Sequence, residues 1–192
     1  MQNSEFMYKE NKKYELLDQY DFAYNEDEII FSEEEEYALA IGKFLISFSN
    51  LEYALNSLVV ESINDRSHDL GYQVIKSLTY ANKVKLAKDL CLQQINLISK
   101  EKTKNKQKTN YEIIFRALSS IGEFRNKVVH ANWVSLDKEH NVRTKIVLND
   151  LGMINFVKIK ITPQTILKFA SKCNSYTPRV SHFHDKVFQS LI

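Results

Sequence analysis

The sequence is poor in the residues that turn a chain. It has four glycines and two prolines among 192 residues, whereas average usage of about 12% would give roughly 23. The four glycines stand far apart, and none begins a GxGxxG or GxxxxGK[ST] pattern. Because phosphate-binding turns need clustered glycines, dinucleotide-binding and P-loop folds are excluded. A β-sandwich or barrel would also need more turn residues, so a mostly helical fold remains.

Cysteine is equally scarce. Cys91 and Cys173 cannot form a disulfide framework, and neither belongs to a CxxC or Cys/His cluster, so we interpret both as reduced thiols in helices. His182, His184 and Asp185 lie close in sequence, but a zinc or iron site needs three or four converging ligands. No other Cys/His cluster supplies them. We therefore interpret this segment as a polar helix face and expect neither a metal ion nor a cofactor.

Long apolar runs are also missing. No stretch of about 18 uncharged apolar residues exists, so we expect no segment that spans a membrane. The N-terminus carries acidic residues and lacks the apolar centre of a signal peptide. Together these absences predict a soluble, cytoplasmic protein.

Charge is divided unevenly along the chain. Residues 1–36 hold three Lys and twelve Asp/Glu, a net charge of −9, and residues 37–192 hold 23 Lys/Arg and twelve Asp/Glu, a net charge of +11. A basic body suits a polyanion such as RNA, although lysine-rich helices can also be simply solvated. Ser32 followed by Glu33–Glu36 is typical of a helix N-cap with an acidic first turn.

Apolar spacing predicts the helices. Residues repeat by threes and fours over 32–63, 72–98 and 109–133, and Thr162-Pro163 opens a last helix that Pro178 should break or kink. The polar, lysine-rich stretch 100–108 reads as an exposed connection. We therefore expect an all-α protein, an up-and-down helical bundle.

One part of the chain has a different period. Val142–Leu148 and Met153–Ile161 alternate or are β-branched, which predicts a β-hairpin at about 142–161, before the C-terminal helix. The expected organisation is an acidic, aromatic N-terminal extension over 1–31 and a helical domain over 32–192 that carries this hairpin.

The third predicted helix carries a polar motif. Arg125 occupies a position of the stripe 114, 118, 121, 125 and 128, where an apolar residue would be expected. A guanidinium there must pair with an anion or face a phosphate. Asn126 and His130 are four residues apart and share the adjacent face.

This motif resembles the signature of the HEPN superfamily, which is Arg, then four to six residues of which the first is polar, then His. Members are compact α-bundles, and many are metal-independent endoribonucleases in toxin–antitoxin, abortive-infection and RNA-guided defence systems. A second copy of the spacing, Arg179 to His184, is followed by apolar Val180 and is set aside. The resemblance covers about 32–133 and implies catalytic roles for Arg125, Asn126 and His130. It also implies a homodimer whose two Arg/His sets share one active site.

Other residues are candidates for supporting roles. Glu52 lies inside the apolar stripe of the first helix, where a carboxylate is stabilised by a nearby cation. We expect Arg125 or Arg116 to be that cation. The alternative is that Glu52 lies at the edge of the core and its side chain reaches solvent. RNA-binding candidates are the lysines Lys100, Lys102, Lys104, Lys106, Lys108 and Lys127, and the hairpin's Arg143, Lys145, Lys158 and Lys160.

The sequence is compatible with two functions. One is an endoribonuclease that cleaves RNA by attack of the 2′-hydroxyl, acting as a toxin or phage-defence effector with a possible antitoxin or regulatory partner protein. The other is a non-catalytic HEPN-like module that binds RNA or nucleotide or mediates protein interactions.

Overall fold

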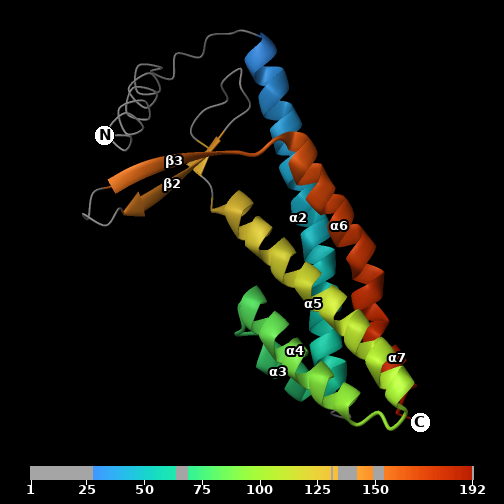
Figure 1. The fold of residues 1–192 in the computed structure, drawn as a ribbon. Helices are drawn as coiled ribbons and strands as arrows, with labels where there is room; N and C mark the ends of the chain where they lie inside the picture. The colour runs from blue at the N-terminus through green and yellow to red at the C-terminus, as the bar shows by residue number, and fades with distance from the viewer. Residues whose placement is uncertain (1–27, 64–68, 131, 134–141, 149–153, 192) are drawn as a thin grey trace, which may run out of the picture. The chain divides into compact units, whose positions relative to one another are not determined.

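The computed structural model describes residues 28–63, 69–130, 132–133, 142–148 and 154–191 (Figure 1). Their backbone is mainly helical, which confirms the predicted helical class. The helices are α2 (Glu28–Ile63), α3 (Asp69–Ile75), α4 (Tyr80–Asn96), α5 (Glu101–Val129), α6 (Pro163–Ser181) and α7 (Phe183–Phe188).

The chain divides into two compact units. One comprises Lys43–Arg125 and Leu167–Ile192, and the other comprises the described part of Met1–Gly42 together with Asn126–Ile166. The second of these contains a three-stranded antiparallel sheet, in the order β1 (Asn132–Trp133), β2 (Val142–Leu148) and β3 (Ile154–Lys160).

The first long helix begins earlier than its predicted start. Helix α2 starts at Glu28, so Ser32 is not its N-cap and the prediction of a cap there is wrong. Glu and Ile at the start of α2 tolerate helix well, and the sequence contains no breaker between Glu28 and Ser32. Of the predicted extension over 1–31, residues 28–31 therefore belong to this helix, and residues 1–27 lie outside the described residues.

The predicted single helix over 72–98 is two helices. Helix α3 ends at Ile75, and Thr79 then takes an extended conformation (φ −68°, ψ 159°), so that its Oγ1 accepts a hydrogen bond from the Asn82 N–H at 3.3 Å. This N-cap starts α4. The apolar pattern continued across the break, because it reports buried faces and not the backbone between them.

The lysine-rich stretch 100–108 is helical from Glu101 onward, which corrects the predicted connection. It forms the first turns of α5, since Lys and Gln are good helix formers. Gln107 is buried, and its Nε2 donates to the Lys186 carbonyl at 3.4 Å and to Ser190 Oγ at 3.2 Å. These bonds tie the start of α5 to α7.

Helix α5 ends sooner than predicted. Its last residue is Val129, and Asn132–Trp133, which were expected in the helix, form β1. Strands β2 and β3 pair in register from Val142 opposite Lys160 to Leu148 opposite Ile154, over the residues predicted as a hairpin. The connection between them lies outside the described residues.

The last long helix continues through its proline. Pro178 was expected to break or kink this segment, but it lies inside α6, which ends at Ser181. Proline removes one backbone N–H at a point where the helix is about to end, so few helical hydrogen bonds remain to be lost. Helix α7 follows after His182.

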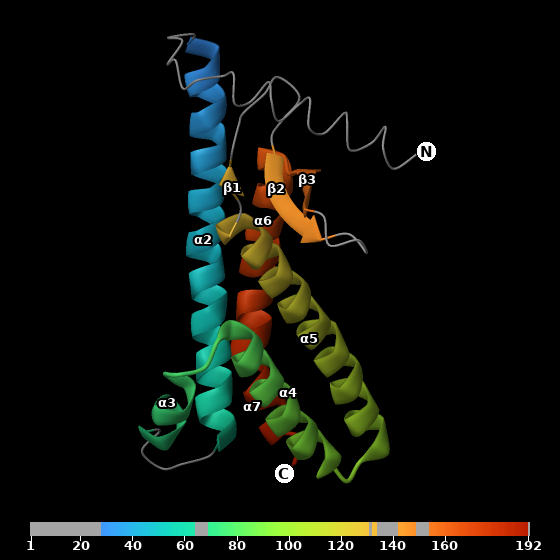
Figure 2. The same ribbon diagram turned by 90° about the vertical axis from the view of Figure 1, so that its left-hand side faces the viewer.

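The unit built from Lys43–Arg125 and Leu167–Ile192 has a continuous apolar core. Helices α2, α4, α5, α6 and α7 all contribute to it, and α3 lies beside the C-terminal half of α2 (Figure 2). Its most deeply buried large side chains are Phe44, Leu51, Leu55, Leu58, Val59, Ile95, Leu118, Ile121, Val180, Phe183 and Val187.

Gly122 allows the ring of Tyr80 to lie directly against α5. A Cβ at position 122 would stand 2.5 Å from Cε1 and 2.8 Å from Cδ1 of Tyr80. We expect Gly122→Ala to lower the free energy of unfolding by about 1–3 kcal/mol, because this strain exceeds the gain in helix propensity. Urea denaturation measures the change.

Gly42→Ala is the matched control. Gly42 is also helical, and a Cβ there meets nothing within 4 Å, so this variant should be neutral or more stable. Equal destabilisation by the two substitutions would contradict the packing argument.

Candidate functional site

Arg125 lies against an aromatic ring. Its guanidinium Cζ is 5.8 Å from the centroid of the Phe48 ring on α2, within the range of a cation–π contact. Arg125 is half-buried, whereas Phe48 is 5% exposed. The position on the predicted apolar stripe is therefore filled by a guanidinium that lies over an aromatic ring.

Phe48 belongs to an aromatic cluster that supports this arginine. Its ring centroid is 4.8 Å from that of Tyr80 and 6.2 Å from that of Phe44. The Tyr80 hydroxyl donates to the Leu118 carbonyl at 3.1 Å. Burial, with smaller contributions from Cys173 and Glu52, raises the pKa of Tyr80 well above its usual range. Tyr80 therefore stays protonated and holds position; it is not an acid or base for chemistry near neutral pH.

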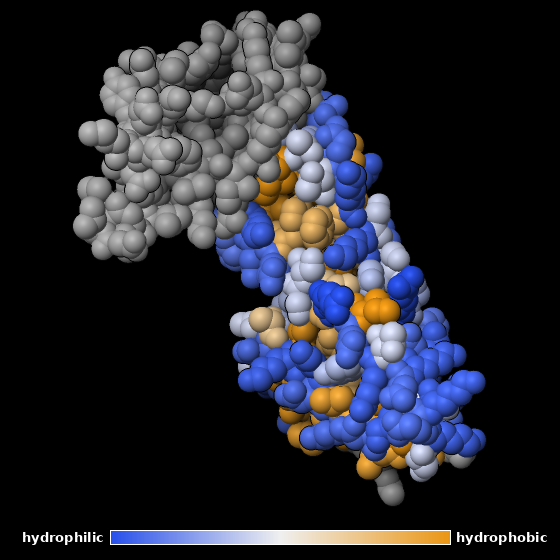
Figure 3. Space-filling model, in the orientation of Figure 1, coloured by the Kyte–Doolittle hydropathy of each residue, from blue (hydrophilic) through white to orange (hydrophobic). Residues whose placement is uncertain are grey.

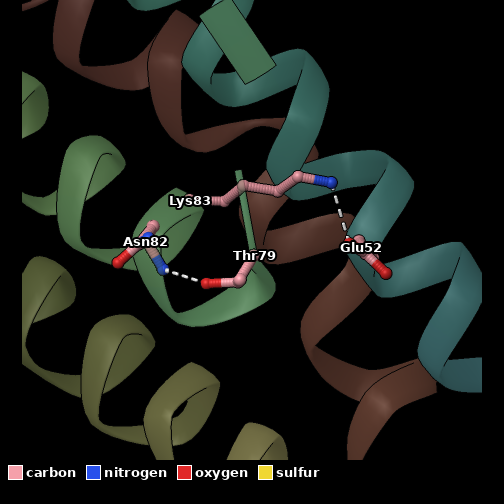
Figure 4. Close-up of polar contacts among 4 residues, drawn as sticks. All are labelled: Glu52, Thr79, Asn82 and Lys83. Atoms are coloured by element: carbon pink, nitrogen blue, oxygen red, sulfur yellow. Dashed lines mark hydrogen bonds and ion pairs between the residues drawn. The ribbon is translucent and has the colours of Figure 1, made fainter. Parts of the chain in front are cut away.

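Glu52 is one helical turn beyond Phe48 on α2, and it pairs with Lys83. Lys83 Nζ donates to Glu52 Oε1 at 2.8 Å, with the Lys83 side chain 12% exposed and the Glu52 side chain 31% exposed (Figure 4). The predicted partner of Glu52 was Arg125 or Arg116, whereas Lys83 makes the ion pair. The N-cap at Thr79 sets the first turn of α4, so the ion pair fixes that turn against α2 beside the aromatic cluster.

The rest of the motif is exposed. Asn126, Lys127 and His130 are all exposed, and the backbone N–H of His130 donates to the Asn126 carbonyl at 3.2 Å. The helical hydrogen-bond pattern thus extends to His130, one residue beyond Val129. His130 is not packed in a core, so a ligand can reach its imidazole.

The side chains of the second Arg-to-His copy make contacts with residues close to them in the fold. Arg179 lies over the Tyr176 ring at 5.1 Å, and His182 Nδ1 is 2.6 Å from the Pro178 carbonyl oxygen. His184 Nδ1 is 3.7 Å from Glu61 Oε2, and its ring stacks on Phe188 at 6.0 Å. Across the described part of the chain, no three His, Cys, Asp or Glu side chains gather as a group that could hold a metal ion.

The candidate RNA-binding lysines differ in exposure. Lys100, Lys102 and Lys106 are exposed, whereas Lys104 and Lys108 are half-buried and Lys104 Nζ donates to the Asn96 carbonyl at 2.8 Å. Figure 3 shows hydrophilic side chains over the region where α5 begins. The helix distributes these lysines around its axis, so they form a basic end to α5 and not a flat stripe.

The strand register gathers the basic residues of the sheet. The four cations of β2 and β3 fall within the pairings of 142–145 with 157–160, whereas 146–148 and 154–156 contain none. Strand β1, which begins two residues after His130, pairs with Thr144 and Arg143 in the basic half. The cations are Arg143, Lys145, Lys158 and Lys160.

The two thiols are buried in helices, as predicted. Burial raises the pKa of Cys91 to about 12 and that of Cys173 to about 11. Because the thiolate is the nucleophilic form, neither cysteine supplies a nucleophile at neutral pH.

No family model matches the chain, and neither a curated protein nor a solved structure does. Among the helices of the described residues, none has the length and apolarity that crossing a membrane requires.

Proposed function

We propose that this protein is a metal-independent endoribonuclease of the HEPN type, with Arg125, Asn126 and His130 as its catalytic residues. The observation that carries the proposal is the placement of the three motif side chains on α5. Arg125 is held on the Phe48 ring at a position of the apolar stripe, while Asn126 and His130, which follow it in the signature spacing, are exposed.

These side chains suit transesterification of RNA. His130 acts as general base on the ribose 2′-hydroxyl, whose oxygen attacks the adjacent phosphorus, or as general acid on the departing 5′-oxygen. Arg125 pairs with the non-bridging oxygens as charge develops on them, in a bidentate geometry that lysine cannot copy. Asn126 orients the imidazole or holds a phosphate oxygen. The products are a 2′,3′-cyclic phosphate and a 5′-hydroxyl.

One histidine in the motif cannot be base and acid in the same step, which supports a homodimer with two Arg/His sets in one active site. A second copy of the chain supplies the missing group without another protein. Sedimentation equilibrium should then give twice the 22.5 kDa mass of one chain; a monomer that still cleaves RNA would overturn this part of the proposal.

The HEPN resemblance supports a role as a toxin or phage-defence effector, with an antitoxin or regulatory protein as its partner. The direct test of activity is incubation of the purified protein with total RNA in EDTA, beside a His130→Ala variant. Cleavage by the wild type alone supports the enzyme. RNA binding without any cleavage would instead support a non-catalytic module.

Neutralising the exposed lysines at the start of α5 should weaken RNA binding without a loss of chemistry. Each phosphate contact contributes about 0.7 to the salt-dependence slope for a single strand. Replacing Lys100, Lys102 and Lys106 with Gln should therefore lower that slope by up to about 2, as measured by RNA binding over a salt series.

The single-turnover rate at saturating RNA should stay within about twofold, because these lysines act in the ground state and the transition state alike. Gln keeps helix propensity close to that of Lys, so circular dichroism should be unchanged. An unaltered salt slope would show that RNA does not contact this end of α5.

A further inference from the structure

A groove of about 400 Å³ opens beside the Glu52–Lys83 pair. It lies between α2, α3 and α4; five of its six lining residues are polar or charged, Ile75 is the one aliphatic member, and most of the surface that they present is apolar. The lining residues are Asn56, Tyr72, Gln73, Ile75, Lys76 and Lys83. A tyrosine, two amide residues and two lysines therefore border one space.

Two of these groups favour an anion. Lys83 uses one of its three N–H donors on Glu52 Oε1, so the ammonium group retains donors for a second acceptor. Lys76 is exposed and follows directly on α3, where its backbone N–H donates to the Tyr72 carbonyl at 3.1 Å. Because Glu52 compensates one charge, the groove keeps a net positive charge from Lys76.

The amides favour a ligand with hydrogen-bonding edges. Asn56 Oδ1 is buried and, among the described residues, has no hydrogen-bond partner. A buried acceptor of this kind is costly unless a donor reaches it. Gln73, which is exposed, adds a second amide with both donor and acceptor capacity.

Tyr72 supplies a flat surface beside the amides. It is 53% exposed although it belongs to a helix that is closely docked. Gly71 brings α3 against α2, since a Cβ at position 71 would stand 3.0 Å from Val60 Cα. The docking of α3 therefore fixes Tyr72 at the groove while its ring stays available for stacking.

We propose that this groove binds one nucleotide, with its phosphate at Lys76 and Lys83, its base stacked on Tyr72, and the base edge hydrogen-bonded by Asn56 and Gln73. Bases stack on exposed aromatic rings in single-stranded RNA recognition, and cations beside them hold the backbone. The RNA source of this nucleotide rests on the proposed ribonuclease function.

The place of the groove along α2 fits a strand that also meets Arg125. Arg125 covers Phe48, Lys83 pairs with Glu52 one turn further on, and Asn56 lines the groove one turn beyond that. Eight residues of helix separate Phe48 from Asn56, which is about 12 Å. One or two nucleotides of a single strand span such a distance, so the groove would contact a base near the phosphate held by Arg125 and influence where RNA is cut.

Isothermal titration with the four nucleoside 5′-monophosphates tests the groove on its own. Tyr72→Ala should weaken binding of the preferred monophosphate by about tenfold, the scale of one stacked base. Tyr53→Ala is the matched control, since Tyr53 is 69% exposed on α2 and does not line the groove; it should leave binding unchanged. Lys76→Gln should reduce the preference for a monophosphate over its nucleoside, because Lys83 alone then holds the phosphate.

RNA cleavage assays with the same variants show whether the bound nucleotide is part of the RNA substrate. If the groove holds a nucleotide of the substrate, Tyr72→Ala should raise KM about tenfold and change the cleavage pattern, while kcat stays within twofold. Monophosphate binding that depends on Tyr72 in a protein without RNA cleavage would support the groove and overturn the ribonuclease. Cleavage with unchanged KM and pattern in Tyr72→Ala, together with no monophosphate binding, would overturn the groove and leave the ribonuclease standing.

Discussion

Replacing His130 with alanine should slow RNA cleavage at least about a hundredfold, the usual scale for loss of a general acid or base. RNA affinity should stay nearly unchanged, because His130 contributes one group to the transition state, whereas attraction in the ground state comes from the basic body of the chain. The imidazole is exposed, so the substitution leaves no cavity. Single-turnover rates and equilibrium RNA binding at one salt concentration separate the two effects.

His184→Ala is the matched control for this experiment. His184 ends the second copy of the Arg-to-His spacing, and it contacts Glu61 and Phe188. Its loss should not alter the cleavage rate. If His130→Ala keeps the wild-type rate, the catalytic assignment fails, and a binding module takes its place.

Arg125→Lys should lower the cleavage rate by about a hundredfold even though the positive charge is kept. Lysine cannot pair with two phosphate oxygens in one plane, and loss of one preorganised contact to a developing oxyanion costs about 10²–10³ in rate. The cation–π contact with Phe48, at 5.8 Å in the wild type, is weakened as well. Single-turnover kinetics at saturating RNA measures the change in the chemical step.

Arg116→Lys serves as its control. Arg116 is an exposed arginine on the same helix, and its replacement should leave the rate unaltered. The unfolding free energy of Arg125→Lys should fall by no more than about 1 kcal/mol, the worth of a partly exposed cation–π contact. A larger loss of stability with an intact rate per folded molecule would make Arg125 a structural residue.

The helical character of the chain could be predicted because apolar periodicity and scarce turn residues act over long segments. The breaks within the predicted helices and the ends of the helices were predicted less well. The apolar pattern runs on through the break before Thr79, so it did not indicate that one helix ends there and that the Thr79 side chain caps a new one. Residues 100–108 include no apolar residue, and Gln107 is buried where it hydrogen-bonds to Lys186 and Ser190, which no local pattern reveals.

The motif on α5 was singled out by its spacing together with the polar Asn126 that follows Arg125, and its catalytic role stays a prediction. Its supports could not be predicted. Phe48 and Tyr80 looked like ordinary core aromatics, and Lys83 pairs with Glu52 across 31 residues of sequence. Such contacts depend on how α4 packs against α2, which sequence spacing within one helix does not determine.

The nature of the nucleophile tests the central claim most directly. A defined RNA oligonucleotide is incubated with the protein in excess EDTA, in parallel with the same oligonucleotide carrying a single 2′-deoxy substitution at the mapped cleavage site. We predict cleavage of the all-ribose strand to a 2′,3′-cyclic phosphate end, and no cleavage at the deoxy position. Loss of cleavage on chelation, or equal cleavage of the deoxy position, would contradict it.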